Sequence, residues 1–119
     1  MKQENIIQDR SLDFAVRVVN LCQYIQQKSN EYILTKQLCK SGTSIGANVR
    51  EAVMAISSAE FLAKMYIALK ESHETEYWIT LLYRTKYITP EEYDSIFHDC
   101  NELTKLLMSI TKTVKNKIK

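Results

Sequence analysis

Glycine and proline are almost absent from this chain of 119 residues, which contains two glycines and one proline. Sandwiches of short strands, collagen-like repeats, flexible linkers and glycine-rich phosphate loops all need these residues in number. Their scarcity excludes those architectures and favours long helices joined by short connections. The length predicts a single domain, residues 1–119, that can bury a core of its own.

Apolar residues recur at helical spacing in four stretches of the chain. The predicted helices cover about residues 9–28, 31–56, 58–86 and 90–116. Strand patterns, internal repeats and linkers are absent from the sequence. The fold class predicted is therefore all-α, an antiparallel up-down-up-down four-helix bundle.

Residues that cap helices mark the boundaries of this bundle. Asp9 or Ser11 is expected to cap the first helix, and Ser57 or Ser58 the third. The run Thr89–Glu92 places a hydroxyl, a proline and two acids where the fourth helix begins. The spacing of its first and last residues is that of a capping box.

The second helix contains both glycines of the chain, Gly42 and Gly46. Its apolar stripe continues through them, at Leu34, Leu38, Ser41, Ile45, Val49, Ala52 and Ile56. The glycines are four residues apart and share one face of the helix. We expect both to be helical, and to let a neighbouring helix approach closely.

Two lines of residues run along the third helix. The line predicted to face the core is Leu62, Tyr66, Leu69, His73, Glu76, Thr80 and Tyr83, with Phe61, Met65, Ala68 and Ile79 beside it. The opposite line is Glu60, Lys64, Ile67, Glu71, Glu74, Trp78 and Leu81. Its apolar members, Ile67, Trp78 and Leu81, suggest a surface for self-association. The alternative is a broader core face that half covers Trp78.

His73 and Glu76 lie on the predicted core side, where a carboxylate needs a partner. Ser41, Ser44 and Asn48 form a polar line on the second helix that could supply one. We expect a buried polar network that fixes the register of the helices. The alternative is a polar network that binds a ligand.

Motifs of catalysis and metal binding are missing. Di-metal bundles use Glu-x-x-His, but Lys70 and Ser95 occupy the positions three before the two histidines. The cysteines, Cys22, Cys39 and Cys100, are odd in number and far apart, which argues for reduced thiols in a cytoplasmic protein. No apolar run approaches the about 20 residues of a membrane span. We expect no enzyme activity, no cofactor, no metal and no membrane contact.

The small net charge, +2, hides a strong asymmetry along the chain. Residues 51–104 are acidic, whereas residues 105–119 carry lysines and no acid. Residues that could contact phosphate are Lys36, Lys40, Lys112, Lys115 and Lys117. Since no aromatic residues are interleaved with them, such binding would be poor in sequence specificity. The alternative for the C-terminal lysines is a solvated helix end.

Two longer motifs carry a family resemblance. Residues 38–52 (LCKSGTSIGANVREA) and residues 67–78 (IALKESHETEYW) are similar to the signature of a bacterial family. Its members are the four-helix bundle proteins encoded within intervening sequences of 23S rRNA genes, which carry an older ribosomal-protein label. The resemblance covers about residues 8–110. One departure is Val49–Ala52, where many relatives carry Ile-Ala-Glu-Gly.

The resemblance implies a bundle that assembles into a ring, typically a homopentamer, with no established enzyme activity. A related branch is the accessory variability determinant of diversity-generating retroelements. It forms a more basic pentameric barrel that contacts nucleic acid and a reverse transcriptase. Association with RNA or a ribonucleoprotein is therefore the leading role expected for this chain. The alternative is a protein-interaction scaffold that does not touch nucleic acid.

Overall fold

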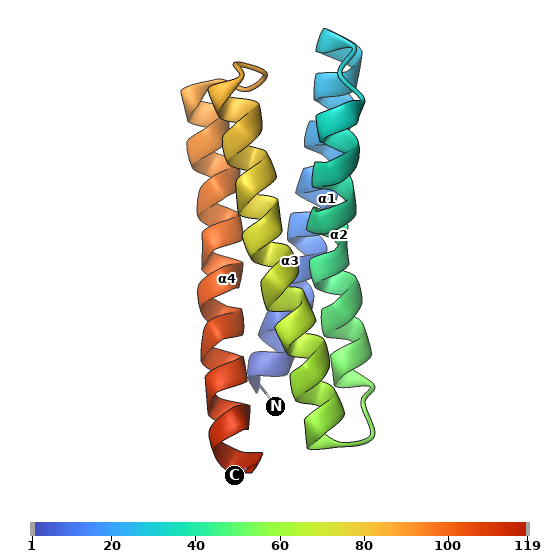
Figure 1. The fold of residues 1–119 in the computed structure, drawn as a ribbon, viewed down its shortest axis with the longest axis vertical. Helices are drawn as coiled ribbons and strands as arrows, with labels where there is room; N and C mark the ends of the chain where they lie inside the picture. The colour runs from blue at the N-terminus through green and yellow to red at the C-terminus, as the bar shows by residue number, and fades with distance from the viewer. Residues whose placement is uncertain (1, 119) are drawn as a thin grey trace.

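Four α-helices make up nearly all of the computed structural model, which describes residues 2–118 (Figure 1). They are α1 (Lys2–Ser29), α2 (Ile33–Val53), α3 (Ser58–Arg84) and α4 (Pro90–Ile118). Residues 1 and 119, the ends of the predicted domain, lie outside the described residues. Each helix runs antiparallel to the one before it, so the predicted up-down-up-down bundle is confirmed.

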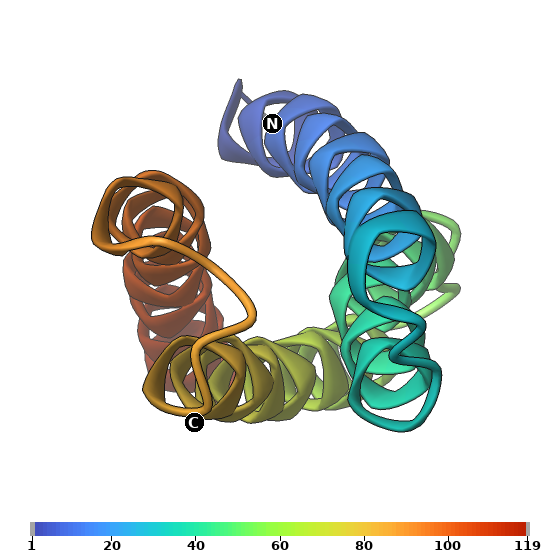
Figure 2. The ribbon, with the colours of Figure 1, turned by 90° about the horizontal axis from the view of Figure 1, so that it is seen from above.

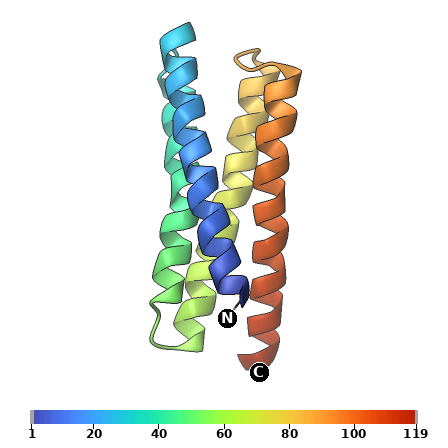
Figure 3. The ribbon, with the colours of Figure 1, turned by 180° about the vertical axis from the view of Figure 1, so that it is seen from behind.

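The bundle is long and open on one side. It measures 48 × 21 × 20 Å. Seen from above, consecutive helices follow one another around a U, with α1 and α4 at its two ends (Figure 2). These two helices share far fewer contacts than any consecutive pair. From behind, they lie closest near the chain termini and separate toward the other end (Figure 3).

All four helices contribute to one apolar core. Val18 of α1, Leu38 and Ile45 of α2, Ile79 of α3 and Leu107 of α4 are completely buried in it. Burying one such side chain contributes roughly 1.5–3 kcal/mol. Among the residues that the structure describes, no helix is both long enough and apolar enough to cross a membrane.

The first helix begins seven residues earlier than predicted. Asp9 and Ser11 lie inside α1, so neither caps it, and the Ser11 hydroxyl donates to the carbonyl of Gln8. The reason is Ile7, which is completely buried and extends the apolar stripe one heptad upstream of Phe14. Burial of this side chain favours the additional two turns of helix.

The second helix ends three residues earlier than predicted, at Val53. Ile56, which the stripe placed toward the core, is instead 95% exposed. The chain turns there because the Ser57 hydroxyl accepts from the Glu60 backbone N–H at 3.1 Å and caps α3. The Glu60 carboxylate accepts in return from the Ile56 N–H at 3.2 Å.

The predicted core face of the third helix is wrong by part of a turn. Tyr66 and His73 are exposed, and the buried residues are Met65, Ala68, Ser72, Thr75, Ile79 and Leu82. Ser72 and Thr75 are completely buried although they are polar. Because apolar periodicity does not register hydroxyls in a core, the predicted face is centred on the neighbouring line, with Met65, Ala68 and Ile79 only at its side.

The end of α3 shows how this chain reverses direction without glycine. Lys86 adopts a left-handed conformation with φ 69°. Its N–H donates to the Tyr83 carbonyl at 3.0 Å, and the N–H of Tyr87 donates to the Leu82 carbonyl at 2.9 Å. This is a Schellman motif with lysine in the position that usually holds glycine. The fourth helix then starts with the predicted capping box between Thr89 and Glu92.

Candidate interaction surfaces

The three residues predicted to form an oligomer contact lie along α3 on its α2 side. Ile67 is 42% exposed, whereas Trp78 and Leu81 are half-buried. Trp78 packs against the core, and the ring of Tyr77 meets it edge to face at 5.0 Å between centroids. The indole N–H of Trp78 is buried and has no acceptor among the described residues.

An acidic pair interrupts this line between Ile67 and Trp78. Burial raises the pKa of the Glu71 carboxyl, and the neighbouring Glu74 raises it further. The nearby Ser44 hydroxyl of α2 and the charge of Lys70 lower the pKa without outweighing these effects. Two turns before Glu71, Lys64 of α3 forms a 3.0 Å ion pair with Glu51 of α2. The flank between α2 and α3 is therefore mixed in character, with apolar and charged residues alternating.

Glu76 is held in a buried polar network, but its partners come from α4. Its carboxylate accepts from the Asn101 amide at 3.1 Å and from the Thr104 hydroxyl at 3.0 Å. The Thr104 hydroxyl also lies 2.9 Å from that of Ser72. The expectation that His73 is buried with Glu76 is wrong, since His73 is exposed and its Nδ1 lies 3.5 Å from the carboxylate.

The polar residues predicted on α2 do not reach Glu76. Ser41 is buried, and its hydroxyl lies 3.0 Å from that of Thr75 on α3. Ser44 and Asn48 instead bond to their own helix, through the carbonyls of Lys40 and Ser44. The network therefore divides into one contact between α2 and α3 and a larger one between α3 and α4.

The two glycines lie in helical α2 and face α1. A Cβ on Gly42 would lie 2.8 Å and 2.9 Å from the two methyl carbons of Val18. A Cβ on Gly46 would lie 3.3 Å from the carbonyl oxygen of Ser11. Both positions therefore have less room than an ordinary methyl group requires, and α1 packs directly over the glycine face.

The candidate phosphate-binding lysines form two groups at opposite ends of the bundle. Lys36 and Lys40 lie on the first turns of α2, and Lys112, Lys115 and Lys117 on the last turns of α4 (Figure 1). All five are exposed. A single chain therefore does not bring them together into one basic surface.

Exposed apolar residues form two patches, of which the sequence pattern indicated only Ile67. The α1 patch consists of Leu12 and Val16, which are 56% and 53% exposed. The α3 patch consists of Tyr66, Ile67 and Tyr77, exposed by 42–60%. The only sequence signal for the α1 patch is its spacing of four residues, outside the main apolar stripe of α1.

A groove lies beside the α1 patch, between α1 and α2. Its volume is about 410 Å³, and Leu12 lies on its edge. Small residues line it, among them Ala15, Gly46 and Ala47. Such a groove can receive a large side chain from another molecule.

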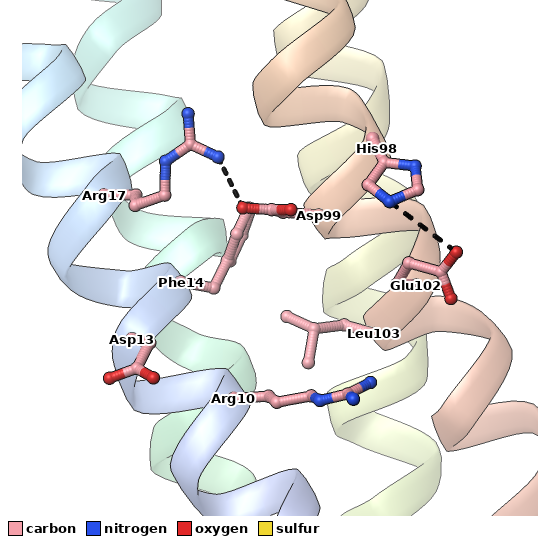
Figure 4. Close-up of a pocket in the computed structure, with 8 residues that line it drawn as sticks. All are labelled: Arg10, Asp13, Phe14, Arg17, His98, Asp99, Glu102 and Leu103. Atoms are coloured by element: carbon pink, nitrogen blue, oxygen red, sulfur yellow. Dashed lines mark hydrogen bonds and ion pairs between the residues drawn. The ribbon is translucent and has the colours of Figure 1, made fainter.

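The seam between α1 and α4 forms a separate cleft of about 460 Å³ (Figure 4). Phe14 and Leu103, both nearly buried, form its floor. Arg17 crosses it, with its guanidinium bonded to the carboxylate of Asp99 and, at 2.9 Å, to the hydroxyl of Ser95. The cleft is thus apolar at its base and charged at its rims.

The cysteines are unpaired, and burial governs two of them. Burial raises the pKa of Cys22 to about 12, with smaller contributions from the neighbouring Cys39 and Glu31. Burial also raises the pKa of Cys100 strongly. Across residues 4–118, no three His, Cys, Asp or Glu side chains are grouped so as to hold a metal ion.

Comparisons with known proteins agree with the architecture. The family model described as 23S rRNA-intervening sequence protein matches residues 3–109. A crystal structure of a protein of unknown function from the S23 ribosomal protein family, from Bacteroides thetaiotaomicron VPI-5482, shares 54% identity and superposes with a TM-score of 0.91. The match covers 92% of this chain and 98% of that one. No curated protein matches the chain. The chain therefore belongs to the 23S rRNA-intervening sequence protein family.

Proposed function

We propose that this protein is a non-catalytic, cytoplasmic subunit that assembles into a closed homo-oligomeric ring. The observation that carries the proposal is the pair of exposed apolar patches on α1 and α3, two helices that do not contact one another. A contact between two different patches is heterologous, and it closes into a ring when the rotation between subunits allows. Five subunits is the number that the family resemblance implies.

The groove beside Leu12 supports this contact. It is lined by small residues and lies next to an exposed leucine, so it has room for a tyrosine of the α3 patch from the next subunit. Aromatic anchors that fill pockets supply much of the binding energy in protein interfaces. Ile67 belongs to this patch, and Trp78 and Leu81 lie beside the patch on the side of α3 that faces α2.

Mixing two variants tests the heterologous contact. The α1 variant combines Leu12→Asp with Val16→Asp, and the α3 variant combines Tyr66→Asp with Ile67→Asp. All four side chains are exposed, so both variants should fold, which circular dichroism verifies. Each variant alone should be monomeric, and their mixture should form a one-to-one dimer through the remaining intact contact. A variant that still forms the full oligomer alone would contradict the proposal.

We further propose that the ring associates with RNA through its lysines. A ring repeats Lys112, Lys115 and Lys117 around one end and Lys36 and Lys40 around the other. Repetition strengthens a weak phosphate contact by avidity. Acidic residues 51–104 would confine this contact to the ends of the bundle.

The test is a titration with structured RNA at two salt concentrations. Affinity should fall steeply with salt, and again when Lys112, Lys115 and Lys117 are changed to glutamine. Lys105→Gln, at an exposed lysine of α4 farther from the helix end, is the control and should have a smaller effect. Absence of binding at low salt would favour a protein-interaction scaffold that does not contact nucleic acid.

A further inference from the structure

The seam between α1 and α4 contains two clefts in line along the bundle. Besides the cleft over Phe14 and Leu103, a second of about 500 Å³ has Leu21 and Ile96 at its base. Leu21 and Ile96 each lie seven positions from their counterparts in the first cleft. The bridge from Arg17 to Asp99 and Ser95 separates the two.

The spacing of the clefts matches that of side chains on a helix. Seven residues of α1 or α4 span about 10 Å along the helix axis. A helix laid along the seam has residues i and i+7 on one face, separated by the same distance. Two large apolar side chains of such a helix would enter the two clefts together.

The bridge between the clefts does not exclude this occupant. The side chains of Arg17 and Asp99 are 41% and 45% exposed. An ion pair so exposed contributes only about 0–1 kcal/mol. A small residue between the two apolar positions would leave room for the bridge beneath the helix.

The charge of the rims selects the kind of helix. In the cleft over Phe14 and Leu103, Arg10 and Arg17 of α1 extend toward α4 (Figure 4). Carboxylates nevertheless outnumber arginines by five to two around the two clefts, and four of the five lie on α4. These four are Glu91, Glu92, Asp99 and Glu102. The electrostatic complement of this rim is a row of lysines or arginines.

We propose that the seam between α1 and α4 binds a cationic amphipathic helix of a partner protein. Its large apolar residues, two turns apart, fill the two clefts, and a small residue passes over the bridge. Its basic residues line the edge that faces α4. The seam lies on the opposite side of α1 from Leu12 and Val16, so the helix can bind to the assembled ring.

The probe is a synthetic helical peptide of about 15 residues. It carries leucines two turns apart, alanines between them and lysines along one edge. One control peptide has the same composition with the leucines on opposite faces, and another has glutamates in place of the lysines. The first peptide should bind the full-length protein saturably. The backbone amide chemical shifts of the protein that change on binding should belong to α1 and α4.

Two variants, each replacing one carboxylate by lysine, refine the test. Glu102→Lys lies on the rim and should weaken peptide binding by about tenfold. Asp94→Lys, exposed on α4 but outside both clefts, should leave binding unchanged. The proposal is overturned if the lysine peptide does not bind or if the glutamate peptide binds equally well. It is also overturned if the peptide dissociates the oligomer, because the seam would then contact another subunit.

Discussion

The hydroxyl of Thr104 on α4 donates to the carboxylate of Glu76 on α3 across 3.0 Å. The contact lies between two helices and is nearly enclosed, with 15% of the Glu76 side chain exposed. A hydrogen bond to a charged group in such surroundings contributes about 1.5–3 kcal/mol. The polar network of this bundle is therefore part of what holds α3 and α4 in register.

Replacing this hydroxyl by a methyl group should destabilise the protein. Thr104→Val keeps the shape of the side chain but deprives Glu76 of a donor, and we expect a loss of about 2 kcal/mol in urea unfolding. Thr111→Val is the matched control, because the buried Thr111 hydroxyl bonds only to carbonyls of its own helix. Equal losses in the two variants would show that the contact with Glu76 contributes nothing specific.

The close approach of α1 to α2 predicts an unusual response to alanine. Gly42→Ala adds a methyl group 2.8 Å from Val18, and overpacking of this kind costs about 1–3 kcal/mol. Gly46→Ala should cost less, since its contact is longer and alanine favours the helix. Val18→Ala should relieve the Gly42→Ala variant in a double-mutant cycle. A higher melting temperature for both single variants would refute the close packing.

The start of α2 depends on a carboxylate that precedes the helix. Burial alone would raise the pKa of Glu31, but its oxygens accept from the backbone N–H groups of Ile33, Leu34 and Thr35 at 2.8–3.0 Å and together they lower it. A lowered pKa gives stability that is present above the ordinary value of 4.5 and is lost as the pH falls through the folded-state value.

Glu31→Gln should therefore remove part of the acid sensitivity of the protein. At neutral pH we expect Glu31→Ala to cost about 1–2 kcal/mol, as the loss of a helix cap does. Denaturant unfolding at neutral pH and below pH 4.5 measures both effects. Unchanged acid sensitivity in Glu31→Gln would contradict the role of this carboxylate.

Because Lys86 adopts a left-handed backbone conformation, glycine should stabilise the protein at this position. Lys86→Gly should raise the free energy of unfolding by about 1 kcal/mol, because glycine adopts φ 69° without a steric penalty. Asn30→Gly, at φ 53°, should give a smaller gain because asparagine tolerates this region. Thermal melts of the two variants compare them directly, and a loss of stability in Lys86→Gly would be evidence against the strain.

Periodicity predicted the helices because their apolar stripes are long. It misplaced the start of α1, because Ile7 alone extends the buried stripe upstream of Phe14. It indicated that Glu76 is buried, since a carboxylate stood within an apolar line. It did not identify Thr104 and Ser72 as partners, because a hydroxyl is compatible with core and surface alike.

The seam between α1 and α4 has no counterpart in the sequence pattern. Phe14 and Leu103 follow the ordinary core stripes of their helices, as they would in a closed bundle. Periodicity reports which face of a helix is buried, and not how tightly the first helix closes on the last. The α1 patch, Tyr66 and Tyr77 were missed for a related reason, since isolated apolar residues on a helix surface are common.

Native mass spectrometry of the unmodified protein tests the central claim, assembly into a ring through the α1 and α3 patches, most directly. The subunit mass is 13.9 kDa, so each added chain is resolved without ambiguity. We expect one dominant species of five chains at micromolar concentration. A dominant monomer under the same conditions would contradict it.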